Sequence, residues 1–306
     1  MPSDSTPNQE NPDKPPFGED NDNAAATAFW ICGVRALETR KPIEESKIRD
    51  PYAEELMCDW AWKQQVKTKT TMPFLYQGIL HRTSYYDSMI LKAASELNCR
   101  QCIFIGAGLD TRAFRLFDNY PDMHVMEVDH PNMFAYKEER MKKFKPKCKR
   151  TIIPLEYHEV TEWDSFAKKK AGFDPSKPTI FVLEGLTMYI PPKGEVELYE
   201  KVNANAAKGS MIMACNLKLL RTFGKPRKME NGITWYDTDR KGVESTMKDW
   251  GIFYKRLHWF DLPGIYLMLV GIKKTEEEYK KVQGQALQQK LAVVAVVVAM
   301  IVYLKG

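Results

Sequence analysis

The sequence predicts an α/β protein in which a doubly wound, mostly parallel sheet follows a helical N-terminal region. Short, wholly apolar runs recur along the chain, and such runs are typical of strands buried on both faces of a parallel sheet. Segments with helical spacing of apolar residues separate them, and strands that alternate with helices form βαβ units with right-handed crossovers. The expected strands cover residues 102–105, 124–128, 151–155, 179–183 and 211–215, and the expected helices lie near 131–144, 162–170 and 192–207.

The region before the first strand is expected to be helical. Residues 24–37 are rich in alanine, and residues 82–97 have apolar side chains at helical spacing. Asp50-Pro51 predicts a helix start, with Asp as the N-cap and Pro at the first position. We therefore divide the folded part of the chain into a helical cap, residues 24–97, and an α/β core, residues 98–274.

The end of the core predicts a change of strand direction. Residues 252–258 and 265–273 are apolar runs separated by a short Asp-Leu-Pro-Gly turn, which indicates an antiparallel hairpin. Residues 218–240 lack a clear periodicity. We expect them to form a loop or lid over the edge of the sheet.

Composition indicates a folded protein with one exceptional end. The 306-residue chain carries a net charge of +5 and is 44% hydrophobic, as in ordinary globular proteins. Residues 1–23 are acidic and rich in proline, so we expect a disordered tail. The remainder is mildly basic, which does not by itself indicate a nucleic acid partner.

The start of the chain and its cysteines favour a cytoplasmic domain. The first residues do not resemble a secretory signal, and the six cysteines are scattered, as expected for reduced thiols. Cys99 and Cys102 have C-x-x-C spacing, but a zinc site would require a second pair, so no metal site is predicted.

The end of the chain has the composition of a membrane anchor. Residues 291–304, LAVVAVVVAMIVYL, follow a charged linker of residues 275–290 and are bracketed by Lys290 and Lys305. As a helix they would span about 21 Å, against roughly 30 Å of hydrocarbon, and snorkelling lysines would cover part of the difference. We expect a C-terminal hydrophobic helix that anchors a cytoplasmic domain to an intracellular membrane; a buried strand or packed helix is the alternative.

Glycines and acids at strand ends predict a cofactor site. Gly106 and Gly108 follow the first strand and permit a sharp turn close to a ligand, but the third position of a G-x-G-x-x-G motif is Thr111, which disfavours a diphosphate. Asp129 ends the second strand, 23 residues after Gly106, where a carboxylate binds the hydroxyls of a ribose. Glu184 follows the fourth strand, where it would bind an amine.

These charges suit S-adenosyl-L-methionine, with its amine and sulfonium, better than NAD or ATP. No P-loop motif is present in the sequence. Glu127 shares a strand face with Asp129 but lies one step deeper. It is either a further ligand or a buried acid paired with a neighbouring donor.

At these residues the sequence resembles the leucine carboxyl methyltransferase family, which includes bacterial polyketide O-methyltransferases. The resemblance covers roughly residues 24–274 and rests on Arg35-Ala36, Asp50-Pro51-Tyr52-Ala53, Arg82, GAGLDTRAFRL from Gly106 to Leu116, EVDHP from Glu127 to Pro131 and EGLTMY from Glu184 to Tyr189. It implies a Rossmann-like, class I methyltransferase fold and S-adenosyl-L-methionine as the cofactor.

The resemblance also implies roles for individual residues. Arg82 would bind the cofactor's carboxylate, Asp129 its ribose and Glu184 its amine. The turn of Gly106, Ala107, Gly108 and Asp110 would pass beneath the methionine part. Family members usually have Asp-Leu near the adenine, and this chain has Glu159-Val160 at about that place.

The reaction expected is methyl transfer to oxygen by in-line displacement. A carboxylate acceptor needs no general base, whereas a phenol or alcohol does, and histidine is the usual candidate. His81 and His130 are the candidate bases and Tyr189 a candidate pocket residue, although His130 and Tyr189 also suit structural roles.

The acceptor itself is left open. We favour a small molecule over the C-terminal leucine of a protein, because of the departure at residue 159 and the apolar tail. A non-catalytic, membrane-tethered cofactor-binding protein is a third hypothesis. The basic runs 141–150 and 168–170 are expected to be solvated faces, and without an added RNA-binding domain neither RNA nor DNA is an expected partner.

Overall fold

A computed structural model describes residues 22–63, 65, 73–218, 226–228, 234–256 and 265–274. The expected N-terminal tail up to residue 21, the charged linker 275–290 and the hydrophobic segment 291–304 lie outside the described residues. Within the part of the chain that the structure describes, no helix is both long enough and apolar enough to cross a membrane.

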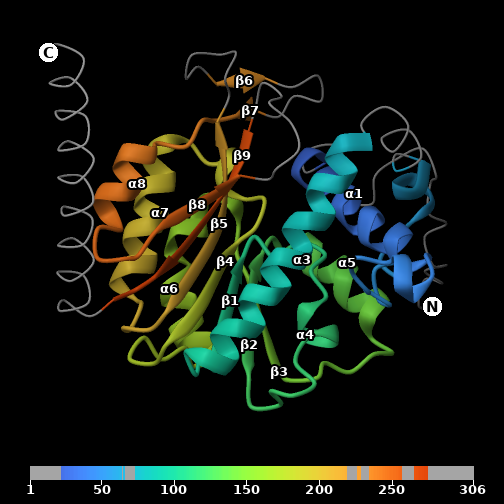
Figure 1. Cartoon of the computed structure of the whole chain (residues 1–306), viewed down its shortest axis with the longest axis horizontal. Helices are drawn as coiled ribbons and strands as arrows, with labels where there is room; N and C mark the ends of the chain where they lie inside the picture. The colour runs from blue at the N-terminus through green and yellow to red at the C-terminus, as the bar shows by residue number, and fades with distance from the viewer. Residues whose placement is uncertain are drawn as a thin grey trace, which may run out of the picture.

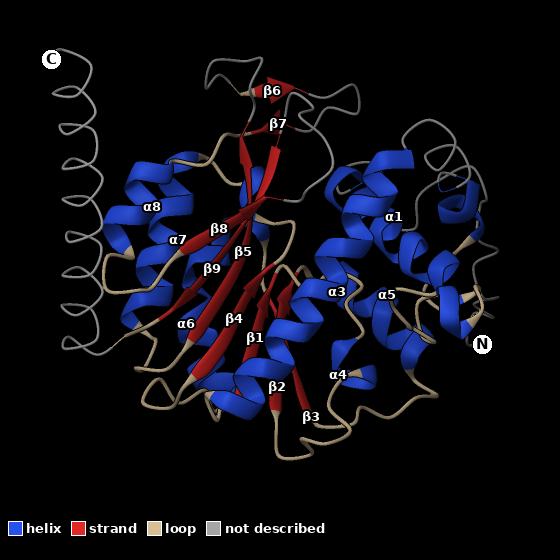
Figure 2. Ribbon diagram, viewed as in Figure 1, coloured by secondary structure: helices blue, strands red, loops and turns tan. Residues whose placement is uncertain are grey.

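The predicted sheet is confirmed. Seven strands lie in the order β3-β2-β1-β4-β5-β9-β8 (Figure 2). The first five strands in this order run parallel to one another, whereas β9 is antiparallel to both β5 and β8. The antiparallel pair of β8 and β9 is the predicted hairpin. The strands are β1 (Gln101–Ile105), β2 (His124–Asp129), β3 (Lys149–Pro154), β4 (Thr179–Leu183), β5 (Met211–Lys218), β8 (Phe253–Arg256) and β9 (Ile265–Ile272).

Helices cover both faces of this sheet, and Figure 1 shows the two layers. The first layer contains α6 (Trp163–Phe166), α7 (Pro192–Ala204) and α8 (Arg240–Thr246). The second contains α1 (Asp22–Thr39), α3 (Pro73–Glu96), α4 (Arg112–Arg115) and α5 (Pro131–Met141).

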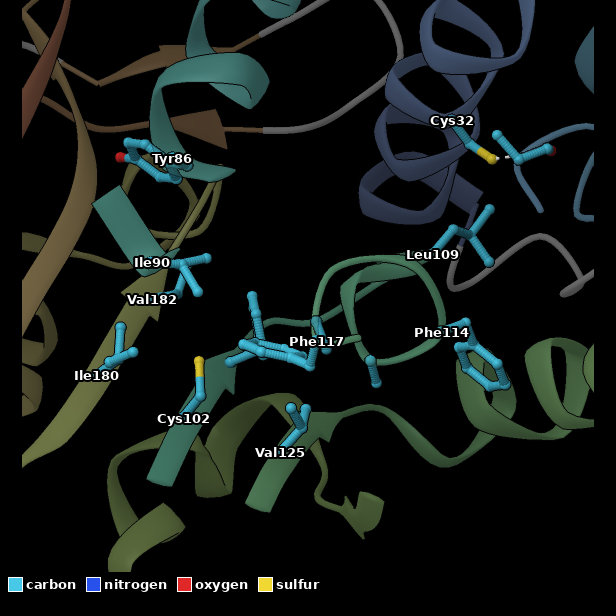
Figure 3. Close-up of a cluster of buried hydrophobic side chains, with 14 of the residues drawn as sticks. Cys32, Tyr86, Ile90, Cys102, Leu109, Phe114, Phe117, Val125, Ile180 and Val182 are labelled. Atoms are coloured by element: carbon cyan, nitrogen blue, oxygen red, sulfur yellow. Dashed lines mark hydrogen bonds between the residues drawn. The ribbon is translucent and has the colours of Figure 1, made fainter. Parts of the chain in front are cut away.

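Burial on both faces explains why the strands are apolar throughout. Alternate side chains of β1 and β4 enter two different hydrophobic clusters. Cys102 and Val182 pack with Ile90 of α3 on the cap side (Figure 3), while Ile103 and Phe181 pack against the α6–α7 layer. The sheet order reverses beside β1, and in such sheets the ligand site lies at the carboxyl ends of the strands next to the reversal.

The cap is helical, but the helix expected at Asp50-Pro51 is absent, since residues 51–56 form turns. The Asp50 carboxylate accepts hydrogen bonds from Arg35 Nε at 2.8 Å and Thr111 Oγ1 at 2.6 Å, besides the Tyr52 backbone N–H at 3.2 Å. Its Oδ2 therefore joins the cap to the core, while the bond from Tyr52 to Oδ1 belongs to a turn and not to a helix. A short 3-10 helix, η1 (Ile43–Glu45), precedes it.

Two further segments differ from the sequence prediction. The single helix expected near 162–170 consists of three short pieces: a 3-10 helix, η2 (Tyr157–Glu162), then α6, then a π-helical turn, η3 (Ala167–Ala171). In the region expected to be a lid, β6 (Arg227–Lys228) pairs with β7 (Thr234–Trp235) as a two-stranded ribbon.

Candidate cofactor and acceptor site

A cavity of about 430 Å³ lies at the carboxyl ends of β1, β2 and β4, beneath α1 and α3. It is the place that the order of the sheet predicts for a ligand. Most of the residues singled out in the sequence line it: Arg82, Gly106, Ala107, Gly108, Asp110, Asp129, His130, Val160, Glu184 and Tyr189.

The glycine turn forms the floor of the cavity. Gly106 and Ala107 donate their backbone N–H groups to the carbonyl of Val128, at 2.9 and 3.0 Å, and so tie the turn to β2. Gly106 has φ +74°, and a Cβ there would lie 3.1 Å from Leu186 Cδ1. Gly108 has φ +50°. Both positions therefore require glycine for the conformation of the backbone, and at Gly106 also for space.

Asp129 lies at the end of β2, between the turn and α5. Its Oδ2 accepts the backbone N–H of Gly108 at 2.6 Å, and its Oδ1 accepts that of His130 at 2.7 Å. Burial raises the pKa of Asp129, while these two hydrogen bonds act in the opposite direction. A carboxylate oxygen can accept a second hydrogen bond, so this fixed carboxylate is suited to the two hydroxyls of a ribose.

Glu184 joins the cap to the end of β4. It accepts Arg82 Nε at 2.8 Å through one oxygen and Arg112 Nη1 at 2.9 Å through the other. Burial alone would raise the pKa of Glu184, but the charges of Arg112 and Arg82 outweigh burial and lower it. The carboxylate is therefore ionised beside the cavity.

Arg82 has one buried donor to spare. Its Nε binds Glu184, and its Nη1 lies 3.7 Å from the Cys215 sulfur. Its Nη2 is buried and has no hydrogen-bond partner among the residues that the structure describes. An unsatisfied buried charged donor is costly, so a guanidinium that lines a cavity in this way is suited to an acidic group of a ligand.

The sequence reasoning missed the ion network behind these residues. Arg112 is buried, and besides Glu184 it binds Asp110 at 2.5 Å and Asp87 of α3 at 2.6 Å. Arg115 binds the other oxygen of Asp87 at 2.6 Å. Both arginines lie in the TRAFRL part of the family motif, which is the signal that could have found them.

The part of the cavity beyond β3, where the resemblance implies an adenine contact, differs from the expectation. Glu159 does not line the cavity, because its carboxylate turns back to accept the backbone N–H of Glu156 at 3.2 Å and closes a capping box at the start of η2. Val160 lines the cavity as expected, together with Glu156. Glu156 is the acid that the structure brings to this end.

The two histidine candidates have different surroundings. His81 lies exposed on α3, with Nε2 3.4 Å from Lys47 Nζ, and does not reach the cavity. His130 lines the cavity, but its Nδ1 accepts the Asn132 backbone N–H at 3.2 Å and its Nε2 lies 2.8 Å from a Glu156 oxygen. Both ring nitrogens of His130 are therefore engaged, Nδ1 at the start of α5 and Nε2 with Glu156 before η2.

Tyr189 lines the cavity from the 3-10 helix η4 (Thr187–Tyr189). Its hydroxyl donates to Thr27 Oγ1 of α1 at 3.0 Å, and burial raises its pKa. Leu186, Ile190, Thr234 and Tyr236 line the cavity as well, and none of these side chains is charged. We call the part of the lining formed by residues 186–190 and 234–236 the less polar end.

Glu127 is a buried acid paired with neighbouring donors. It is fully buried and accepts Lys137 Nζ at 2.8 Å and Arg150 Nη2 at 2.7 Å. Of the two readings of Glu127, the structure supports a structural ion cluster beneath the site.

Comparison with known proteins identifies the family. The family model of leucine carboxyl methyltransferase matches residues 28–203. A Mycobacteroides abscessus protein named as an S-adenosyl-L-methionine-dependent methyltransferase is 29% identical, over 68% of this chain and 72% of its own length. A Mycobacterium avium protein of the same name is 28% identical over 83% and 86%, and another from that organism is matched over 65% of its length.

Two solved structures share the fold. A DUF574 family protein from Streptomyces avermitilis has a TM-score of 0.58 at 10% identity, covering 81% of this chain and 97% of its own. A protein from Thermobifida fusca named as a methyltransferase has a TM-score of 0.55 at 15% identity, covering 85% and 99%. With more than half of its residues matched, the chain belongs to the leucine carboxyl methyltransferase family of S-adenosylmethionine-dependent methyltransferases.

Proposed function

We propose that this enzyme transfers the methyl group of S-adenosylmethionine to an oxygen of a small molecule, a carboxylate or an acidic hydroxyl. The observation that carries the proposal is that one cavity combines the charged residues Arg82, Asp129 and Glu184, its charged end, with the uncharged lining of the less polar end, and holds no uncommitted histidine among the described residues that line it. A nucleophile that arrives already ionised needs no base there.

The charged end supplies what the cofactor requires. We assign the unpartnered Arg82 Nη2 to the cofactor's carboxylate, Glu184 to its amine and Asp129 to its ribose. The positive φ of Gly106 and Gly108 brings the backbone, with no Cβ, against the ligand. When bound, S-adenosylmethionine supplies a methyl group made electrophilic by the adjacent sulfonium.

The less polar end would orient the acceptor. In-line displacement requires the attacking oxygen about 3–3.5 Å from the methyl carbon and opposite the sulfur. Attack of an anion on a sulfonium disperses charge, so Leu186 and Ile190 favour the reaction by excluding water. Burial raises the pKa of Tyr189, and its hydroxyl proton is already donated to Thr27 Oγ1, so Tyr189 is a wall of the acceptor end and not a base.

The C-terminal leucine carboxylate of a protein is the second candidate, favoured by the family match. It has the same nucleophile, so the chemistry of the site suits both. A small molecule must fit entirely within the cavity, whereas a peptide must leave it. Association of the tail with an intracellular membrane stays a prediction.

The decisive test is calorimetric titration of S-adenosylmethionine into the full chain and into Asp129→Ala, followed by methyl transfer from radiolabelled cofactor to a panel of carboxylates, phenols, alcohols and leucine-ended peptides. Binding that the substitution abolishes, with turnover of a small carboxylate or phenol, is the expected result. Turnover of peptides alone would replace the small-molecule proposal with the second candidate, and binding with no turnover on the whole panel would contradict both.

A further inference from the structure

The less polar end of the cavity is bounded by a segment that precedes α8. Thr234 and Tyr236 of this segment line the cavity. The Tyr236 backbone N–H donates to the carbonyl of Met188 in η4 at 2.9 Å. We call residues 234–239 the flap; they comprise β7 and the segment that leads from it to α8, and they contact the proposed acceptor end.

One buried side chain of α7 holds the other end of the flap. Glu195 is 1% exposed, although it is a glutamate. Its Oε2 accepts the backbone N–H of Asp239 at 3.2 Å, and its carboxyl is also hydrogen-bonded to the hydroxyls of Thr238 and Thr187. These partners come from the flap and from η4, so three elements meet at this carboxyl.

The inference rests on the proposed function for the identity of the bound acceptor. We propose that Glu195 is a positioning residue that holds the flap closed over the acceptor end of the cavity. The helix that carries it is rigidly seated, since Leu198, Tyr199 and Val202 of α7 are fully buried against the sheet. The position of Tyr236 is thereby set from the opposite layer of the fold.

Burial and hydrogen bonding act on the Glu195 carboxyl in opposite directions. Burial raises its pKa, whereas the hydrogen bonds from Thr238, from the Asp239 backbone and from Thr187 lower it. Asp239 is the charged neighbour on the flap side; its own side chain caps α8 by accepting the Gly242 N–H. Burial, with the nearby Asp239 charge, raises the pKa of Glu195 to about 7.

The closed flap therefore binds a proton that the open flap releases. An exposed glutamate has a pKa near 4.3, so above that value opening of the flap is coupled to ionisation. Raising the pH toward and through 7 favours the open flap, and a glutamine at residue 195 removes this dependence. A residue that only filled space in α7 would show neither effect.

Hydrogen exchange of the full chain tests whether Glu195 holds the flap closed, and it needs no acceptor. Peptides that cover residues 234–246 are compared in wild type, Glu195→Ala, Glu195→Gln and the control Glu197→Ala, an exposed acid on the same helix. We expect about tenfold faster exchange in Glu195→Ala, the loss of roughly one to two hydrogen bonds. Glu195→Gln and the control should stay near wild type, because an amide oxygen still accepts from the flap.

The pH dependence adds a second arm. After correction for intrinsic exchange, flap exchange should rise between pH 6 and 8.5 in wild type and stay flat in Glu195→Gln. Equal flap exchange in wild type and Glu195→Ala, with both proteins folded by circular dichroism, would contradict the proposal that Glu195 holds the flap closed.

Steady-state kinetics test whether the flap held by Glu195 positions the acceptor. For an acceptor identified in the panel, we expect the KM of Glu195→Ala to rise about tenfold, with the dissociation constant of S-adenosylmethionine unchanged and Glu195→Gln close to wild type. A faster-exchanging flap with an unchanged acceptor KM would refute the positioning role. If the panel yields no acceptor, the proposed function fails, while the exchange experiment still decides whether Glu195 holds the flap.

Discussion

Replacing Asp87 with Asn tests whether the buried ion network holds the cap on the core. The Asp87 carboxylate on α3 accepts Arg112 Nε at 2.6 Å, Arg115 Nη1 at 2.6 Å and Arg115 Nη2 at 3.0 Å. The two guanidinium side chains are only 2% and 7% exposed. Asn keeps the shape and one acceptor oxygen but removes the charge between them.

The expected loss is about 3 kcal/mol of unfolding free energy, the lower end of the range for breaking a buried ion pair from one side. The lower end applies because Arg112 keeps Asp110 and Glu184 as partners, and Arg115 keeps Thr111. The matched control is Glu96→Gln, which breaks an exposed pair with Lys92 on the same helix. It should cost less than about 0.5 kcal/mol.

Urea unfolding at pH 7, followed by circular dichroism, measures both losses. The difference between Asp87→Asn and wild type should also depend on pH. Burial would raise the pKa of Asp87, but the charges of Arg115 and Arg112 lower it. The stabilisation is therefore complete above the unfolded pKa of about 3.9 and is lost as the pH falls through the folded pKa. A loss at pH 7 no larger than that of the control would refute the reasoning.

Three further predictions concern the cavity and the flap. Arg82→Gln should weaken S-adenosylmethionine binding about tenfold to a hundredfold by calorimetry, because the donor that we assign to the cofactor's carboxylate loses its charge; unchanged affinity would contradict that assignment. Gly106→Ala should cost about 1–2 kcal/mol in urea unfolding and also weaken cofactor binding, since φ is +74° and the new Cβ would meet Leu186; wild-type behaviour in both assays would show that the turn tolerates a side chain. The folded pKa of Glu195 is raised to about 7, so the stability that Glu195 contributes is present at pH 5 and lost as the pH rises. Between pH 5 and 8, the unfolding free energy of Glu195→Gln should therefore rise by about 2 kcal/mol relative to wild type, measured by thermal and urea unfolding. A difference between the two proteins that does not change with pH would contradict the ionisation.

The sheet could be predicted from the sequence because burial on two faces leaves an unmistakable pattern. β4 begins and ends where the apolar run 179–183 does, and the antiparallel hairpin follows from the turn between two apolar runs. The prediction failed at Asp50-Pro51 because a local capping pattern cannot reveal a competing long-range partner. Arg35 and Thr111 bind Oδ2 of Asp50, and although Oδ1 accepts the Tyr52 backbone N–H, residues 51–56 form turns.

The site was predictable where the backbone alone determines position. Acids at the ends of parallel strands converge at one edge, and Asp129 and Glu184 do so beside the glycine turn. The prediction that Glu159 lines the cavity was wrong because two acids lie three residues apart at the start of η2. Only the geometry of the turn determines that Glu156 is the one that lines the cavity. Sequence spacing does not distinguish them.

The helical cap covers the cavity and also supplies charged groups that bind the core, which limits where the acceptor site can vary. Arg35 binds the Leu109 carbonyl, Asp87 binds Arg112, and Arg82 binds Glu184, so α1 and α3 are attached to the glycine turn and to β4 by charged groups. A substitution in these attachments would disturb the cofactor's own ligands. The flap contacts the acceptor end through Thr234 and Tyr236 and none of those ion pairs. Variation in the acceptor is therefore expected to arise in the flap and η4, where it leaves the cofactor's ligands unaltered.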